Sequence, residues 1–185
     1  MIGTFAGAVL DKDECGTTLA WKHCFPDRPI PEILRHVRNR DIGTEGYYDG
    51  ENPDSEAIAE GLSALRHKAE HKIKFLQQIT IDPEAITKCR AFGYEAVTLK
   101  YEVSRAAITR FTWQELDGYK VPYLELRREE ERYHSAIGNL LAGLVPDLFS
   151  WVVMTNGSSS LRSKGFDVSV IAEKFGGGGH RKAAG

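Results

Sequence analysis

Apolar residues in the first part of the chain recur at helical spacing. From position 54 to position 76 they follow one another at steps of three or four residues, which places them on one face of a helix. These positions are Ile58, Leu62, Leu65, Ala69, Ile73 and Leu76. Asp54 precedes them and is a typical N-cap residue. The pattern predicts a long amphipathic helix.

Prolines and turn residues mark the other boundaries in this part of the chain. They indicate a helix at 14–25 that Pro26 ends, a helix opened by Pro31, a loop at 43–53, and a helix opened by Asp82 and Pro83. We expect that last helix to break near Gly93, because glycine weakens a helix interior. The apolar residues 1–10 are predicted to form a strand or a strand end.

The apolar period then changes from helical to alternating. Phe111 and Trp113 alternate with polar residues, as do Val121 and Tyr123, and between them lies Asp117-Gly118. Alternation on both sides of an Asp-Gly pair is typical of a β-hairpin. The rest of the pattern predicts a helix at 136–144, strands at 148–154 and 158–163, and a short helix capped by Asp167.

These elements predict an α/β protein with two parts. Residues 1–104 form a mainly helical domain, and residues 105–185 form an α/β domain around a small mixed sheet. The composition fits a globular protein, with 42% hydrophobic and 27% charged residues. A net charge of -2 excludes a strongly basic nucleic-acid binder, so any polyanion site must be a local patch.

The three cysteines and the lengths of the apolar runs bear on the cellular compartment. Cys15, Cys24 and Cys89 have no CxxC spacing, so neither a zinc site nor a disulfide framework is expected. Reduced thiols are typical of a cytoplasmic protein. No apolar run approaches the roughly 18 residues of a transmembrane helix, and we expect no membrane partner.

The glycine run at 176–179 carries the strongest chemical signal. Glycine lets backbone N–H groups approach an anion, and His180, Arg181 and Lys182 add further donors. If Ala183 and Ala184 continue as a helix, its N-terminal end also faces the anion. The alternatives are a flexible linker or a helix C-cap, although a C-cap needs one glycine rather than four. Arg162 offers a second cation on the preceding strand.

Several residues near the C-terminus together resemble the C-terminal domain of the DHH phosphoesterase superfamily. They are Ser160-Leu161-Arg162-Ser163, Phe166-Asp167-Val168, Ile171-Ala172, Phe175, Gly176 to His180, and Ala183-Ala184-Gly185. In that superfamily this domain holds a nucleotide or a short oligonucleotide. The resemblance and the local chemistry give a predicted phosphate-binding set of Arg162, Ser163, Gly176, Gly177, Gly178, Gly179, His180 and Arg181.

A second stretch resembles the DHH domain itself. It comprises Gly16 to Trp21, Phe25-Pro26, Pro31 and Arg40-Asp41-Ile42, with Asn39 and Gly43 departing from the superfamily pattern. The resemblance makes Asp41 a candidate ligand of Mn²⁺ or Mg²⁺. The Asp-His-His motif itself does not occur in the sequence. His67 and His71 have metal-compatible spacing but no supporting acidic motif, which favours a polar helix face. His23, His36 and His134 have no partner that the sequence identifies.

Three functions remain open from the sequence. The chain is part of a metal-dependent phosphoesterase, or a non-catalytic module that binds a nucleotide or nucleic-acid phosphate, or a structural protein that forms a homodimer through its long helix. Two-metal hydrolysis needs several ligands around one metal pair. Because Asp41 is the single candidate, we expect no phosphoesterase activity from this chain alone.

Overall fold

The computed structural model describes residue 11 and residues 13–42, 53–64 and 82–185. Contacts within the chain group it into two compact units, Met1–Val97 and Thr98–Gly185. Helix α5 (Pro83–Ile108) runs through this boundary, and the division expected after residue 104 falls inside the same helix. Helices dominate the first unit and a mixed sheet forms the second, which confirms the predicted α/β class.

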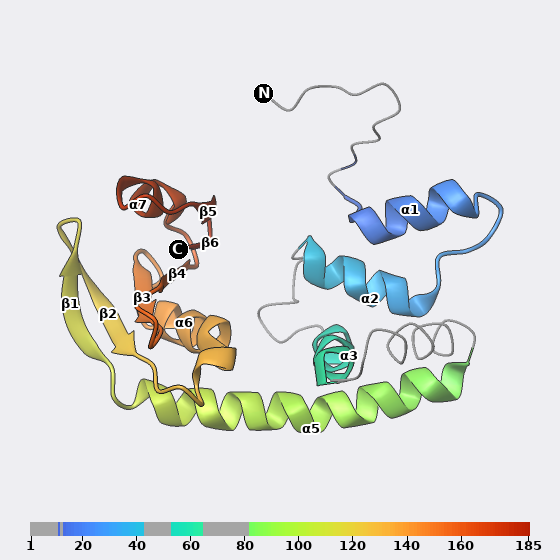
Figure 1. Cartoon of the computed structure of the whole chain (residues 1–185), viewed down its shortest axis with the longest axis horizontal. Helices are drawn as coiled ribbons and strands as arrows, with labels where there is room; N and C mark the ends of the chain where they lie inside the picture. The colour runs from blue at the N-terminus through green and yellow to red at the C-terminus, as the bar shows by residue number, and fades with distance from the viewer. Residues whose placement is uncertain (1–10, 12, 43–52, 65–81) are drawn as a thin grey trace. The chain divides into compact units, whose positions relative to one another are not determined.

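Among the described residues, three further helices belong to the first unit (Figure 1). They are α1 (Gly16–Cys24), α2 (Glu32–Asp41) and α3 (Pro53–Ala64). The predicted helix starts near residues 14 and 31 and at Pro83 are therefore confirmed. A small core joins α2, α3 and α5 through buried Ile33, Ile58, Ile86 and Cys89.

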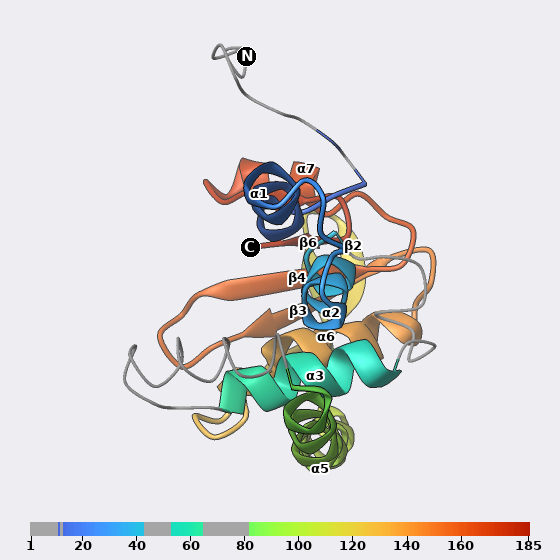
Figure 2. The same ribbon diagram turned by 90° about the vertical axis from the view of Figure 1, so that its right-hand side faces the viewer.

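The predicted break near Gly93 is wrong, since α5 continues through it. A Cβ at Gly93 would lie 1.7 Å from the carbonyl oxygen of Ala57 on α3, and one at Gly61 would lie 2.4 Å from that of Cys89. Each glycine thus lets one helix backbone approach the other, and Figure 2 shows α3 crossing α5. Tertiary packing overrides the weak helix propensity of glycine here.

Asp54 does not cap α3 as predicted, because the helix already begins at Pro53. Its carboxylate instead accepts a hydrogen bond from the Tyr94 hydroxyl and lies 3.7 Å from Nε of Arg90. Several predictions lie outside the described residues: the strand at 1–10, the loop up to residue 52, and the continuation of the long helix, including His67 and His71.

The second unit contains a six-stranded sheet in the order β1-β2-β3-β4-β6-β5. Its strands are β1 (Thr112–Leu116), β2 (Tyr119–Glu125), β3 (Phe149–Val153), β4 (Ser159–Ser163), β5 (Gly179–His180) and β6 (Ala183–Ala184). Strands β2 and β3 run parallel and all other neighbours run antiparallel. Asp117 and Gly118 have φ values of 53° and 81°, which confirms the predicted hairpin turn.

Each face of the sheet packs against a helix, as the alternation along β2, β3 and β4 requires. The 3-10 turn η1 (Glu131–Tyr133) leads into α6 (His134–Gly143), which covers one face with Ile137 and Leu141. Helix α7 (Ser169–Lys174) covers the other with Ile171 and Ala172. Within the described residues, no helix is both long enough and apolar enough to cross a membrane.

Candidate functional site

Arg162 and His180 lie on one row across three neighbouring strands. Arg162 on β4 pairs with Ala183 on β6, and Ala183 pairs with His180 on β5. Directly opposed residues share a face, so all three side chains lie on the α6 side of the sheet. With neighbouring strands about 4.8 Å apart, the Arg162 and His180 Cα atoms are about 10 Å apart. We call Arg162, Ala183 and His180 the Arg162 row.

Contacts with the first turns of α6 fix the Arg162 side chain. A Cβ at Gly138 would lie 2.8 Å from Arg162 Cγ, so this glycine makes room for the arginine stem. The Nη1 atom of Arg162 donates to the Leu161 carbonyl at 2.8 Å, and Nη2 donates to Ser135 Oγ at 2.9 Å. The guanidinium is therefore held at the edge of α6, beside β6.

Ser163, predicted to belong with Arg162, lies on the opposite face. It pairs with Phe149, whose side chain belongs to the core under α7. Ser163 is buried, and its hydroxyl has no hydrogen-bond partner within the described part of the chain. Adjacent strand residues point to opposite faces, so the sheet separates these two side chains.

The first two glycines of the run end helix α7. Gly176 adopts a left-handed φ of 81°, its N–H donates to the Glu173 carbonyl, and the Gly177 N–H donates to that of Ala172. This is the Schellman C-cap, in which a glycine in the left-handed conformation lets two N–H groups bond carbonyls of the last turn. The C-cap alternative therefore holds for the start of the run.

The rest of the run forms an edge hairpin instead of the helix considered at Ala183-Ala184. Gly178 and Gly185 exchange two backbone hydrogen bonds, so Gly179 and Ala184 form a non-hydrogen-bonded pair. The N–H of Gly179 then points away from β6, toward the open edge of the sheet. Hence the glycine segment directs one N–H group outward, not a nest of several, and no helix N-terminus follows it.

Gly178 differs from its neighbours in the space around it. A Cβ at Gly177 would lie 2.4 Å from the Gly185 carbonyl oxygen, and one at Gly179 would lie 2.6 Å from that of Ala183. A Cβ at Gly178 would meet nothing within 4 Å. The fold therefore explains Gly176, Gly177 and Gly179, whereas the surface at Gly178 is open to an approaching molecule.

Arg181 and Lys182 form the tight turn between β5 and β6. The Arg181 carbonyl accepts a hydrogen bond from the Val168 N–H, and its exposed Nε lies 3.9 Å from Asp167. Asp167 also accepts hydrogen bonds from the backbone and the hydroxyl of Ser169, but it is not the predicted cap, because Val168 is the N-cap residue of α7. Arg181 thus lies one residue beyond the Arg162 row, at the exposed end of the hairpin.

Sequence reasoning named His134 without a partner, and it did not predict that three residues of α6 are linked to Arg162 directly or through Ser135. These are His134, Ser135 and Gly138. Ser135 Oγ lies 3.2 Å from His134 Nε2, and His134 Nδ1 lies 2.9 Å from the Glu131 carbonyl oxygen. The one available signal was a glycine, Gly138, inside an otherwise apolar helical pattern.

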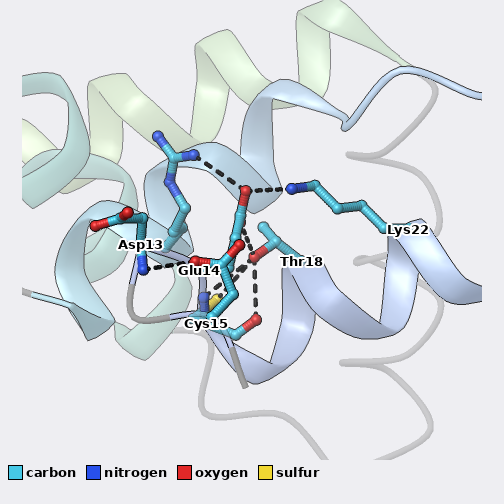
Figure 3. A network of polar contacts seen from close by, with 7 residues as sticks. Asp13, Glu14, Cys15, Thr18 and Lys22 are labelled. Carbon is cyan, nitrogen blue, oxygen red and sulfur yellow. Dashed lines mark hydrogen bonds and ion pairs between the residues drawn. The ribbon is translucent and has the colours of Figure 1, made fainter. Parts of the chain in front are cut away.

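A polar network joins α1 and α2 in the helical unit (Figure 3). The buried Glu14 carboxylate accepts hydrogen bonds from Lys22 and Thr18 and lies 3.7 Å from Nη1 of Arg38. The Lys22 hydrogen bond contributes most to lowering the Glu14 pKa, followed by that from Thr18. The network is a cluster of opposite charges, consistent with a structural role, although the buried Nε of Arg38 has no hydrogen-bond partner among the described residues.

Cys15 lies at the N-terminal end of α1, next to Glu14. Burial alone would raise the pKa of its thiol, but hydrogen bonds with Thr18 and Thr17 outweigh burial, and the pKa lies below its ordinary value. By contrast, burial raises the pKa of Cys89. All three cysteines are free, as predicted.

The candidate metal ligand Asp41 is the last residue of α2, and it is exposed. In the described ranges, no three His, Cys, Asp or Glu side chains gather closely enough to hold a metal ion. The described His, Cys, Asp and Glu residues therefore do not fit a two-metal centre. No reaction step through Mn²⁺ or Mg²⁺ follows from their arrangement. His36, on the same helix, lies 2.7 Å from the Ser55 hydroxyl through Nδ1.

Comparison with known proteins assigns no activity. No protein-family model matches the chain. The uncharacterized protein R106 of Acanthamoeba polyphaga mimivirus is 28% identical over an alignment of 181 positions, which covers 94% of this chain but 41% of that protein. An uncharacterized protein from Helicobacter pylori G27 is 18% identical, over 95% of this chain and 61% of that chain, with a TM-score of 0.33. The resemblance to DHH phosphoesterases therefore rests on the motif residues alone.

Proposed function

We propose that the second unit binds the phosphate of a nucleotide or short oligonucleotide along the Arg162 row. The observation that carries this proposal is the strand register, which brings Arg162 and His180 onto one face with small Ala183 between them. An arginine binds phosphate oxygens through paired N–H donors, and histidine donates to phosphate or stacks on a base. Ala183 leaves room for a ligand between the two side chains.

Gly178 supports the same location. It lies two residues before His180, and the space at its Cα is open. A glycine without a packing role is expected where a ligand or another backbone approaches closely. Arg181 and Lys182 place further positive charge at the end of the hairpin, which attracts a phosphate despite the net charge of -2.

The resemblance to the DHH superfamily supports a nucleotide-type ligand. In such enzymes the corresponding domain holds the substrate, while paired metal ions bound elsewhere activate water. We propose that this chain retains binding and does not hydrolyse phosphoesters by itself. A cytoplasmic location, consistent with the free cysteines, and a homodimer belong to the same proposal.

Titration of a 5′-phosphorylated adenosine dinucleotide into the full chain tests the binding site. Losing one charge-assisted hydrogen bond costs about 1.5–3 kcal/mol, so Arg162→Ala should weaken binding by about tenfold or more. Gly178→Val should also weaken it, by filling the open space. As a control, Lys164→Ala removes a positive charge outside the row and should bind as the wild type does. Equal affinity in all four proteins would refute the site.

Hydrolysis is tested separately. We expect no Mn²⁺-dependent cleavage of a short oligonucleotide or of a phosphoadenosine monoester by the full chain. Turnover that disappears in Asp41→Ala would contradict the proposal and place a metal-dependent active site at the end of α2.

A further inference from the structure

A directed chain of hydrogen bonds begins at Arg162 and ends at the backbone carbonyl of Glu131. The carbonyl oxygen of Glu131 can only accept, so the proton of the neutral His134 ring lies on Nδ1. The other ring nitrogen, Nε2, is then an acceptor, and the Ser135 hydroxyl donates to it. The oxygen of Ser135 is left to accept from Arg162 Nη2, which can only donate.

With a neutral His134 ring, each group in this chain has one donor or acceptor role. The order is Arg162 to Ser135, Ser135 to His134, and His134 to the Glu131 carbonyl. Hydrogen bonds that run in one direction strengthen one another, and they restrict the rotation of the Ser135 hydroxyl. Glu131 is itself held, because its carboxylate accepts from the backbone and the hydroxyl of Thr155.

The aliphatic part of Arg162 is fixed independently of this chain. A Cβ at Gly138 would lie 2.8 Å from its Cγ, so the arginine stem lies against the α6 backbone. A flexible arginine loses side-chain entropy when it binds a ligand, whereas a preorganised one has already lost it. The geometry therefore favours ligand binding through both the stem contact and the hydrogen-bond chain.

We propose that Ser135 and His134 are positioning residues, which hold the Arg162 guanidinium ready for an anionic ligand. The assignment rests on the proposed phosphate binding by Arg162 and extends it to two residues on a different element. Neither residue needs to touch the ligand. Their effect on binding must then pass through Arg162, which makes the proposal testable.

A double-mutant cycle measures this dependence, with the 5′-phosphorylated adenosine dinucleotide as ligand. Ser135→Ala should weaken binding roughly fivefold in the wild-type background. In the Arg162→Ala background the same change should have no further effect, because the two residues act as one unit. Ser135→Thr keeps the hydroxyl and should retain wild-type affinity. Equal weakening in both backgrounds, or none in either, would overturn the proposal.

A second measurement needs no ligand and separates this inference from the proposed function. The NMR signals of the Arg162 guanidinium protons should be resolved in the wild type and in Ser135→Thr, and averaged in Ser135→Ala and His134→Phe. Wild-type affinity in Arg162→Ala would refute the proposed function, while resolved signals would still support positioning. Averaged guanidinium signals in the wild type would refute positioning whatever the affinities are.

Discussion

The two units use glycine for different purposes. In the helical unit, Gly61 and Gly93 let two helix backbones approach each other, and a side chain on either would meet a carbonyl oxygen. In the α/β unit, Gly176 ends a helix, and Gly177 and Gly179 fit against neighbouring backbone. An added Cβ would meet nothing within 4 Å at Gly176 or Gly178, but only Gly176 of these two has a left-handed φ. Neither backbone conformation nor packing explains Gly178, in contrast to the other three glycines of the run.

The units also differ in how charged residues are placed. In the helical unit Glu14 has Lys22 and Arg38 beside it, and ion pairs such as Arg38–Glu14 and Arg90–Glu32 link different helical segments. In the α/β unit Arg162 is held by neutral oxygens of Ser135 and Leu161. The hydrogen bonds to these two oxygens fix the orientation of the guanidinium.

The largest expected effect concerns the helix crossing. Gly93→Ala should destabilise the helical unit by about 3 kcal/mol, because the added Cβ would lie far inside contact distance of Ala57. Urea unfolding followed by circular dichroism measures the change. Gly16→Ala is the matched control, since nothing lies within 4 Å of its Cβ position and alanine is the better helix former. Equal stability of Gly93→Ala and wild type would mean that the two helices do not cross at this point.

The second effect concerns a buried ion pair of the α/β unit. Glu130 accepts from Arg110 Nη2 at 2.7 and 2.6 Å and from the Arg127 N–H, and its side chain is 9% exposed. Glu130→Gln should cost about 2 kcal/mol in the free energy of unfolding, less than a fully buried pair because Arg110 is a third exposed.

The control for that ion pair comes from the other unit. Glu84→Gln breaks an exposed pair with Lys88 and should change stability by less than about 0.5 kcal/mol. If both variants were destabilised equally, burial would not be what distinguishes the two pairs.

The third effect separates two adjacent glycines. Gly177→Ala should destabilise the α/β unit by about 1.5 kcal/mol, since its Cβ would lie 2.4 Å from the Gly185 carbonyl oxygen. Gly178→Ala should stay within about 0.5 kcal/mol of wild type. Thermal unfolding of the two variants decides the matter. Two equally destabilised variants would show that Gly178 also has a packing role.

The smallest effect is a pH dependence in the helical unit. Because the folded-state pKa of Glu14 is lowered from its ordinary value of 4.5, its stabilisation is present above that pH and is lost as the pH falls through the folded-state pKa. Glu14→Gln should therefore lower stability at pH 7, by less than about 1 kcal/mol, and this difference should shrink below pH 4.5. A difference that stays constant from pH 7 to pH 3 would contradict this assignment.

Local patterns in the sequence predicted most of the described elements. Alternation around Asp117-Gly118 predicted the hairpin, and prolines marked the starts of α2 and α5, because these signals act over a few residues. The predictions failed where a residue that is distant in the sequence determines the local structure. Gly93 looked like a helix break because Ala57, which it packs against, is 36 positions away in the sequence.

The same distinction between local and long-range determinants applies to the candidate site. The sequence by itself determined that a glycine run, a histidine and an arginine lie near the C-terminus, since residue types are local facts. Only the tertiary structure decided that Arg162 and His180 share a row, that Ser163 lies on the opposite face, and that Ser135 holds the guanidinium. Strand register and helix placement arise from the packing of the whole unit, and one residue of slip would reverse every one of these faces.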